Sequence, residues 1–255
     1  MTIKRSNRFL ILLFIILFLF ISCSSRTPRK AKTPYHHFNR SRIYYDQGRI
    51  QEALSEIKEA IKLGPEDARF YQFLGFIYFS MGNYSEAEAA YLKTLEINPD
   101  LTDARNHLGV LYIHTDRLDE ALKEFRLALK DRFYSSPEVI YFHLGELYRK
   151  KNDLEEASAH LRRALEINPK YYRAHYELGN ILSEQGDMQE AIFEYEVVGM
   201  NKAYQRDPNF HFSFAMAYLK AGQRDKAKQH LLKVVELAPG TPNYIRAKEI
   251  LKTLE

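Results

Sequence analysis

The apolar positions of this chain repeat at a fixed interval. From residue 34 onward they recur with a period of about 34 residues, and each period holds two stretches with helical spacing. This pattern predicts two amphipathic helices in each copy. Six copies are present, and they begin near Pro34, Ala68, Thr102, Glu138, Tyr172 and Pro208. The third and fifth copies are longer than the others, so we expect insertions in the connections that follow them.

Two positions of the repeat stay small. Position twenty is alanine in every copy: Ala53, Ala87, Ala121, Ala157, Ala191 and Ala227. Position eight is glycine, serine or alanine: Ser41, Gly75, Gly109, Gly145, Gly179 and Ala215. Small residues that recur in both halves of the period predict that the two helices approach closely there. Large residues at positions eleven and twenty-four can fill the space beside them.

A turn separates the two halves of each copy. Its position fifteen holds Gly48, Gly82, Asp116, Asn152, Gly186 and Gly222. Glycine, asparagine and aspartate tolerate positive φ better than other residues, so we expect a left-handed residue between the helices. Each copy is therefore predicted to be a helix hairpin.

These recurring positions together resemble the tetratricopeptide repeat (TPR), and the resemblance covers residues 34–241. It implies an all-α fold in which six TPR helix hairpins stack into a right-handed superhelix with a concave inner face. Residues 242–255 carry one apolar stripe and resemble the capping helix that ends such arrays.

The first 22 residues have the pattern of a secretory signal peptide. Three basic residues precede Phe9–Ile21, an unbroken apolar run of 13 residues. A membrane-spanning helix needs about 20 apolar residues, so the run fits the hydrophobic region of a signal peptide better. Cys23, the only cysteine of the chain, stands just after this run.

Residues 19–23, Leu-Phe-Ile-Ser-Cys, resemble the lipobox of bacterial lipoproteins. The resemblance implies cleavage before Cys23, lipidation of its thiol, and a place in the outer membrane facing the periplasm, since Ser24 is not Asp. Residues 23–33 lack apolar periodicity and are predicted to form a flexible basic tether. The alternative is an uncleaved N-terminal anchor in which the cysteine has no role.

Charge argues against nucleic acid as a partner. The 255-residue chain has a net charge of +4, but seven basic residues and no acid precede position 34, which leaves −3 for residues 34–255. A nucleic-acid-binding domain needs a basic face on its folded part. The predicted partners are therefore a protein and, through the anchor, a membrane.

No residues form a recognisable catalytic constellation. The sequence lacks a His-Glu-x-x-His motif, a nucleophile elbow and a phosphate-binding glycine loop. His36 and His37 are adjacent, but no third metal ligand is near them in sequence. We therefore expect no enzymatic activity, no cofactor and no metal site.

The TPR resemblance also implies which side chains face a partner, because the first helix of each repeat lines the concave groove. Aromatic and aliphatic groups gather at these positions in the first three copies, and we predict that they form the partner-binding groove: Phe38, Tyr45, Phe76, Phe79, Val110 and Ile113. A second patch is predicted at Phe212 and Met216. Exposed strips of this kind bind peptides or helices. The alternative is that the rings pack against the next repeat.

One finer resemblance concerns residues 128–137, Ala-Leu-Lys-Asp-Arg-Phe-Tyr-Ser-Ser-Pro. This stretch is similar to the junction between the third and fourth repeats in the type IV pilus biogenesis/stability family, the pilotins. The resemblance implies a lipid-anchored scaffold that binds the outer-membrane secretin subunit and promotes its localisation and multimerisation. The alternative is a general TPR lipoprotein scaffold for peptidoglycan or outer-membrane protein assembly.

Overall fold

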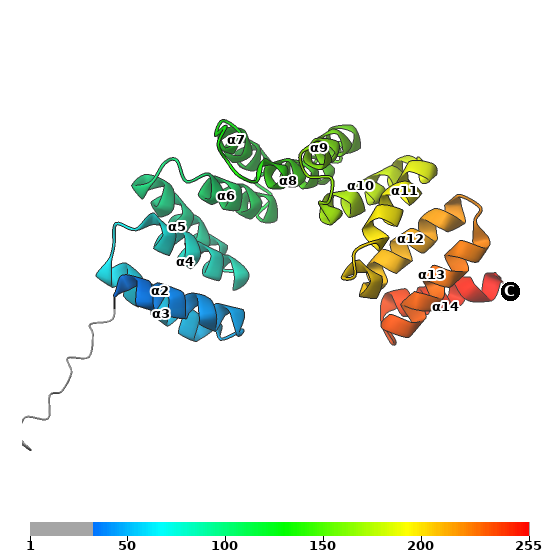
Figure 1. Cartoon of the computed structure of the whole chain (residues 1–255), viewed down its shortest axis with the longest axis horizontal. Helices are drawn as coiled ribbons and strands as arrows, with labels where there is room; N and C mark the ends of the chain where they lie inside the picture. The colour runs from blue at the N-terminus through cyan, green and yellow to red at the C-terminus, as the bar shows by residue number, and fades with distance from the viewer. Residues whose placement is uncertain (1–32, 255) are drawn as a thin grey trace, which may run out of the picture. The chain divides into compact units, whose positions relative to one another are not determined.

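The computed structural model describes residues 33–254, and the part of the chain that it describes is entirely helical (Figure 1). The signal-peptide, lipidation and tether predictions fall on residues 1–33, which apart from residue 33 lie outside it. The hairpins are α2 (Pro34–Asp46) with α3 (Ile50–Leu63), α4 (Ala68–Ser80) with α5 (Tyr84–Ile97), α6 (Thr102–His114) with α7 (Leu118–Ala128), α8 (Pro137–Lys150) with α9 (Leu154–Ile167), α10 (Tyr172–Gln185) with α11 (Met188–Gly199), and α12 (Pro208–Lys220) with α13 (Arg224–Leu237). A short 3-10 helix η1 (Tyr204–Arg206) precedes α12, and α14 (Pro242–Thr253) follows α13. Six helix hairpins and a terminal helix confirm the predicted fold class.

The chain divides into two compact units, Met1–Pro65 and Glu66–Glu255. The described part of the first unit is the hairpin of α2 and α3. In the second unit each hairpin lies beside the next in chain order, because α5 contacts α6, α7 contacts α8, α9 contacts α10 and α11 contacts α12 (Figure 1). Helix α14 packs against both α12 and α13.

The predicted turn residues adopt the left-handed conformation. All six residues at position fifteen have positive φ, between 62° and 98°. Asp116 and Asn152 are the two that are not glycine, and both lie at φ 62°. Aspartate and asparagine enter this region more readily than other non-glycine residues, which agrees with their place in the turns of the third and fourth copies.

Each hairpin is held together by a close approach between its two helices. The alanines at position twenty are fully buried in all six copies. At position eight, the glycine lies directly against the large residue at position twenty-four: Gly75 against Tyr91, Gly109 against Phe125, Gly145 against Leu161 and Gly179 against Tyr195. The ring or branched side chain thus occupies the volume that a Cβ would need.

Position four links three of the hairpins to the segments that precede them. Arg105, His175 and His211 each donate a hydrogen bond to the carbonyl oxygen six residues earlier. The same three side chains also reach position twenty-three on the second helix, where they contact Glu124, Glu194 and His230. His37 makes the equivalent contact to Glu56 in the first unit. The histidines at position four therefore have structural partners.

The two buried histidine contacts shift pKa values in opposite directions. Burial lowers the pKa of His175, but its hydrogen bonds to Glu194 and to the Pro169 carbonyl outweigh that effect and raise the pKa overall. His211 donates from Nε2 to the Gln205 carbonyl, so its Nδ1 accepts the Nδ1–H of His230 at 2.9 Å. Burial and the nearby His211 lower the pKa of His230 to about 4.

Gly109→Ala should lower the free energy of unfolding by about 1–3 kcal/mol. The added Cβ would lie 2.5 Å from the ring of Phe125, which is fully buried and has no room to move away. Urea denaturation followed by circular dichroism measures the change. Gly199→Ala is the matched control, because its Cβ would meet Phe210 at 3.7 Å, an ordinary contact distance. Equal losses in the two variants would contradict the close-approach interpretation.

The His230 contact should make stability depend on pH. The folded-state pKa is depressed, so His230 contributes its full stability above the ordinary histidine pKa of about 6.5 and loses it as pH falls toward about 4. Between pH 7 and pH 5, the free energy of unfolding of wild type relative to His230→Gln should fall by up to about 1 kcal/mol, after allowance for solvent screening. The raised pKa of His175 has the opposite effect on stability, but this effect is the same in wild type and variant and cancels from their difference. A difference in free energy of unfolding between the two proteins that stays constant with pH would contradict the depressed pKa of His230.

Candidate functional site

The first helices of consecutive hairpins form one surface within the second unit. Helix α6 contacts both α4 and α8, and α10 contacts α12. Two equivalent lysines span neighbouring first helices: Lys150 Nζ donates to the Ile113 carbonyl at 2.6 Å, and Lys220 Nζ donates to the Ser183 carbonyl at 3.0 Å. Residues at positions twelve and thirteen of successive repeats are therefore neighbours, which is the arrangement that a continuous groove requires.

Four of the predicted groove residues lie on this surface and on two adjacent helices. Phe76 and Phe79 come from α4, and Val110 and Ile113 come from α6; all four are half-buried. Phe79, Val110 and Ile113 pack against the core cluster whose buried residues come from α5 to α8. These three side chains thus have one side against the core, and all four keep part of their surface open to solvent. We call these four residues the apolar patch.

Histidine rings border the apolar patch. The ring of Phe79 meets His114 edge-on, with centroids 5.0 Å apart, and Phe76 lies 6.2 Å from His107. Tyr84, at the start of α5, contacts both Phe79 and His114. Aromatic neighbours therefore pack beside both phenylalanine rings at the edge of the apolar patch.

The other two predicted groove residues, Phe38 and Tyr45, belong to α2 in the first unit. Both are half-buried. The guanidinium of Arg42 lies 6.0 Å from the centre of the Phe38 ring. A partner contact at Phe38 and Tyr45 stays a prediction.

The predicted second patch is largely covered by the terminal helix. Phe212 is only 8% exposed, and the guanidinium of Arg246 from α14 lies 4.9 Å from the centre of its ring. Met216 is half-buried and packs against the same cluster, which includes Leu231 and Ala247. A partner that touched Phe212 would first have to displace Arg246.

Farther along the surface the groove positions are charged. Arg149 on α8 pairs with Glu177 and Glu184 on α10, both at 2.6 Å. Burial raises the pKa of Glu177 above its ordinary value, although Arg149 acts against this change. Arg173 approaches Glu146 at 3.9 Å. The surface therefore changes from apolar on α4 and α6 to ion-paired on α8 and α10.

One polar group on α6 is left without a partner. Asn106 is 6% exposed, and its side-chain oxygen Oδ1 is buried with no hydrogen-bond donor in the described part of the chain. A buried, unsatisfied acceptor costs about 1–3 kcal/mol. Val110 and Ile113 follow it by one and two helical turns, so the three share a face of α6. The sequence alone does not show that the acceptor of Asn106 would be unpaired.

Residues 33–254 contain no group of three histidine, cysteine or acidic side chains arranged to hold a metal ion. None of the helices in this range has the length and apolarity needed to cross a bilayer. Cys23, the predicted lipidation site, lies outside the described residues. The described first helices therefore carry an apolar patch on α4 and α6 and a row of ion pairs on α8 and α10, and one buried acceptor lies on α6.

Comparison with protein families identifies the repeats. Family models described as tetratricopeptide repeat match residues 38–102, 77–136 and 208–241, and a model described as TPR repeat matches residues 145–186. A curated relative, the BBSome complex member BBS4 homolog of Drosophila melanogaster, is 23% identical over 127 residues, which are 46% of this chain and 26% of that protein. The chain thus spans about a quarter of the length of this relative.

Solved structures share the fold. PilW, described as a widely conserved type IV pilus biogenesis factor, aligns with a TM-score of 0.77 and 18% identity over 84% of this chain and 98% of that one. The pilF protein of Pseudomonas aeruginosa aligns with a TM-score of 0.74 and 16% identity over 85% of this chain and 97% of that one. YrrB, described as a TPR protein with an unusual peptide-binding site, aligns with a TM-score of 0.56 and 24% identity over 76% of this chain and 97% of that one. At these identities the likeness establishes the fold alone.

Proposed function

Because this chain is a tetratricopeptide repeat protein, we propose that it is a scaffold whose groove binds an apolar segment of a partner protein. The observation that carries the proposal is the apolar patch on α4 and α6, whose four side chains are half-buried and remain partly open. Half-buried side chains of this kind gain free energy when a partner covers their remaining surface, about 25 cal/mol for each Å² of apolar area.

Asn106 lies on the same face of α6 as Val110 and Ile113, but its Oδ1 is buried, so it is not open to a partner at the surface. The partner chemistry that fits the open part of this face is therefore an apolar segment.

We propose further that the partner is the secretin subunit of a type IV pilus and that the protein acts as a pilotin. Two features support this. Residues 128–137 are similar to the repeat junction of the pilotin family, and the fold is shared with PilW and with the pilF protein over more than four-fifths of this chain. In this mechanism the groove holds an apolar segment of the secretin subunit while the anchor keeps the complex at the membrane.

The proposed location is the outer membrane, on its periplasmic side, with Cys23 carrying the lipid. Several acyl chains give stable attachment, since each buried methylene contributes about 0.8 kcal/mol. The basic segment between Cys23 and α2 then acts as a spacer between the membrane and the repeats.

Phe76→Glu combined with Phe79→Glu should reduce the amount of SDS-resistant secretin multimer in cells to about a tenth or less, because a carboxylate cannot be covered by an apolar segment without a large desolvation cost. Immunoblotting of cell envelopes measures the multimer. Phe193→Glu is the matched control, since Phe193 is 59% exposed and lies on the second helix of its hairpin, away from the groove. The double variant must keep wild-type helicity and membrane association.

Two outcomes separate the parts of this proposal. Wild-type multimer levels in the double variant would exclude the groove as the secretin site. Unchanged multimers and intact pilus-dependent motility after deletion of the whole gene would exclude the pilotin role and leave the general scaffold for envelope assembly.

Cys23→Ser should abolish incorporation of labelled palmitate and release the protein from the membrane fraction, because no other thiol exists in the chain to carry the lipid. Metabolic labelling followed by immunoprecipitation measures this. Ser22→Ala, which keeps a small residue before the cysteine, is the control and should retain the label. Palmitate incorporation that persists in Cys23→Ser would refute the lipidation.

A further inference from the structure

The connection between the third and fourth hairpins exposes an aromatic side chain almost completely. Phe133 is 96% exposed, more than any other large apolar side chain in residues 33–254. A lone exposed phenylalanine costs free energy in water, roughly 1.5–3 kcal/mol relative to burial. It lies in the insertion that lengthens the third repeat, outside the groove formed by the first helices.

The segment that carries Phe133 is tied to the start of α6. The backbone N–H of Phe133 donates to Asp131 Oδ1 at 3.0 Å, and Thr102 donates its hydroxyl to Asp131 Oδ2 at 2.6 Å. The hydroxyl of the next residue, Tyr134, donates to Asp103 Oδ1 at 2.7 Å. The hydrogen bonds from Thr102 and Phe133 lower the pKa of Asp131, so this carboxylate stays charged and the anchor is present at neutral pH. These bonds fix Phe133 in its outward position.

Four cations lie on α7 and on the connection that follows it: Lys123, Arg126, Lys130 and Arg132, which we call the basic ridge. All four are exposed, and none forms an ion pair within the described residues. Three acids of α7 already pair with other cations. Glu124 pairs with Arg105, Asp119 pairs with Lys151, and Glu120 pairs with Arg117.

The basic ridge is unusual for this chain, because residues 34–255 carry a net charge of −3. Lys123, Arg126 and Lys130 line a hollow beside Leu127, and its one acid, Asp119, pairs with Lys151, so these three cations create a local patch of positive potential. Such a patch attracts and orients an acidic partner.

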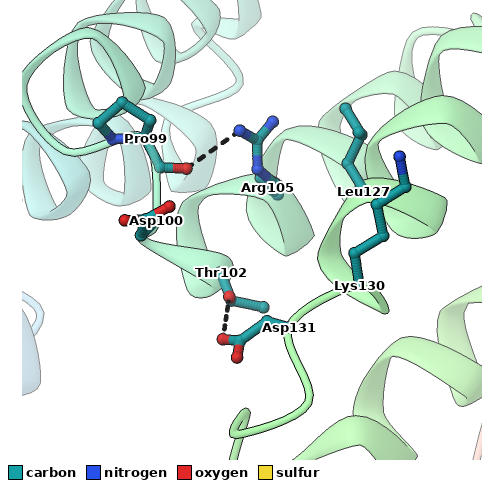
Figure 2. Close-up of a pocket in the computed structure, with 7 residues that line it drawn as sticks. All are labelled: Pro99, Asp100, Thr102, Arg105, Leu127, Lys130 and Asp131. Carbon is teal, nitrogen blue, oxygen red and sulfur yellow. Dashed lines mark hydrogen bonds between the residues drawn. The ribbon is translucent and has the colours of Figure 1, made fainter.

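Two hollows flank Leu127 beside the ridge. One has a volume of about 360 Å³, and Figure 2 shows Leu127 and Lys130 on one side of it, Arg105 on the other, and the bonded pair of Thr102 and Asp131 at its base. The second, of about 470 Å³, is lined by Asp119, Leu122, Lys123 and Arg126 and shares Leu127 and Lys130 with the first. The first hollow also contains the carboxylates of Asp100 and Asp131, so the second, with two leucines and three cations, is the better site for an apolar side chain of an acidic segment.

We propose that the basic ridge, Phe133 and the hollows beside Leu127 form a second docking surface, which binds an acidic protein segment carrying an apolar side chain. The carboxylates of the segment pair with the ridge, its apolar group enters a hollow, and its backbone covers Phe133. The surface lies on α7 and the connection that follows it, so it can be occupied while the groove is filled. An acidic protein segment fits this surface because Leu122 and Leu127 can contact its apolar side chain while Lys123, Arg126 and Lys130 pair with its carboxylates.

The test selects ligands from a display library of short random peptides, using the full chain with Phe76→Glu and Phe79→Glu to remove groove binders. We expect enrichment of peptides that are rich in Asp and Glu and contain an apolar residue. Fluorescence anisotropy then measures the Kd of the enriched peptides. Phe133→Ser should weaken binding about tenfold, and Lys130→Glu with Arg132→Glu should abolish it. Raised salt should weaken binding to wild type.

Matched controls use surface residues elsewhere on the second unit. Met200→Ser replaces an apolar side chain that is 73% exposed in the other insertion, and Lys170→Glu with Lys202→Glu reverses two exposed cations. Neither should change the Kd. Selected peptides without acidic residues, a failure to select any peptide, or a Kd unaffected by Phe133→Ser would overturn the proposal. Binding to phosphatidylglycerol vesicles in place of peptides would assign the surface to a membrane. Because the groove variant is used throughout, these outcomes do not depend on the secretin proposal.

Discussion

The close approach of two helices within each hairpin is the constraint on which the rest of this structure depends. At position eight, a glycine leaves the volume that the residue at position twenty-four fills, so Gly75 receives the Tyr91 ring and Gly109 receives the Phe125 ring. This contact sets the spacing of the two helices. Once that spacing is set, the first helices of neighbouring hairpins can lie side by side, and only then do side chains of different repeats form one surface.

The polar contacts made by the residue at position four differ in charge from repeat to repeat. Position four joins the preceding connection to the second helix through Arg105, His175 or His211. The three contacts share their geometry but differ in charge, so the third repeat uses an ion pair and the sixth uses two histidines. A repeat fold can therefore keep one architecture while its stability responds to pH differently from one hairpin to the next.

The molecule separates its candidate binding surfaces by helix. First helices carry the apolar patch and Asn106, whereas the basic ridge lies on a second helix, α7, and on the insertion that follows it. Insertions break the repeat period, so their side chains are not committed to packing between repeats. Phe133 is such a side chain, and four hydrogen-bonding residues around it keep it exposed.

The sequence by itself determined the hairpins, because packing at positions eight and twenty and positive φ at position fifteen are local requirements that recur in every copy. It also placed Phe76, Phe79, Val110 and Ile113 on first helices. Only the tertiary structure decided what each side chain meets. Arg246 covers Phe212 from a helix that begins 30 residues later, Arg149 finds acids 28 and 35 residues away, and Asn106 finds no donor. Such contacts join residues of different repeats, and a pattern that records one repeat at a time contains no information about their distance or exposure.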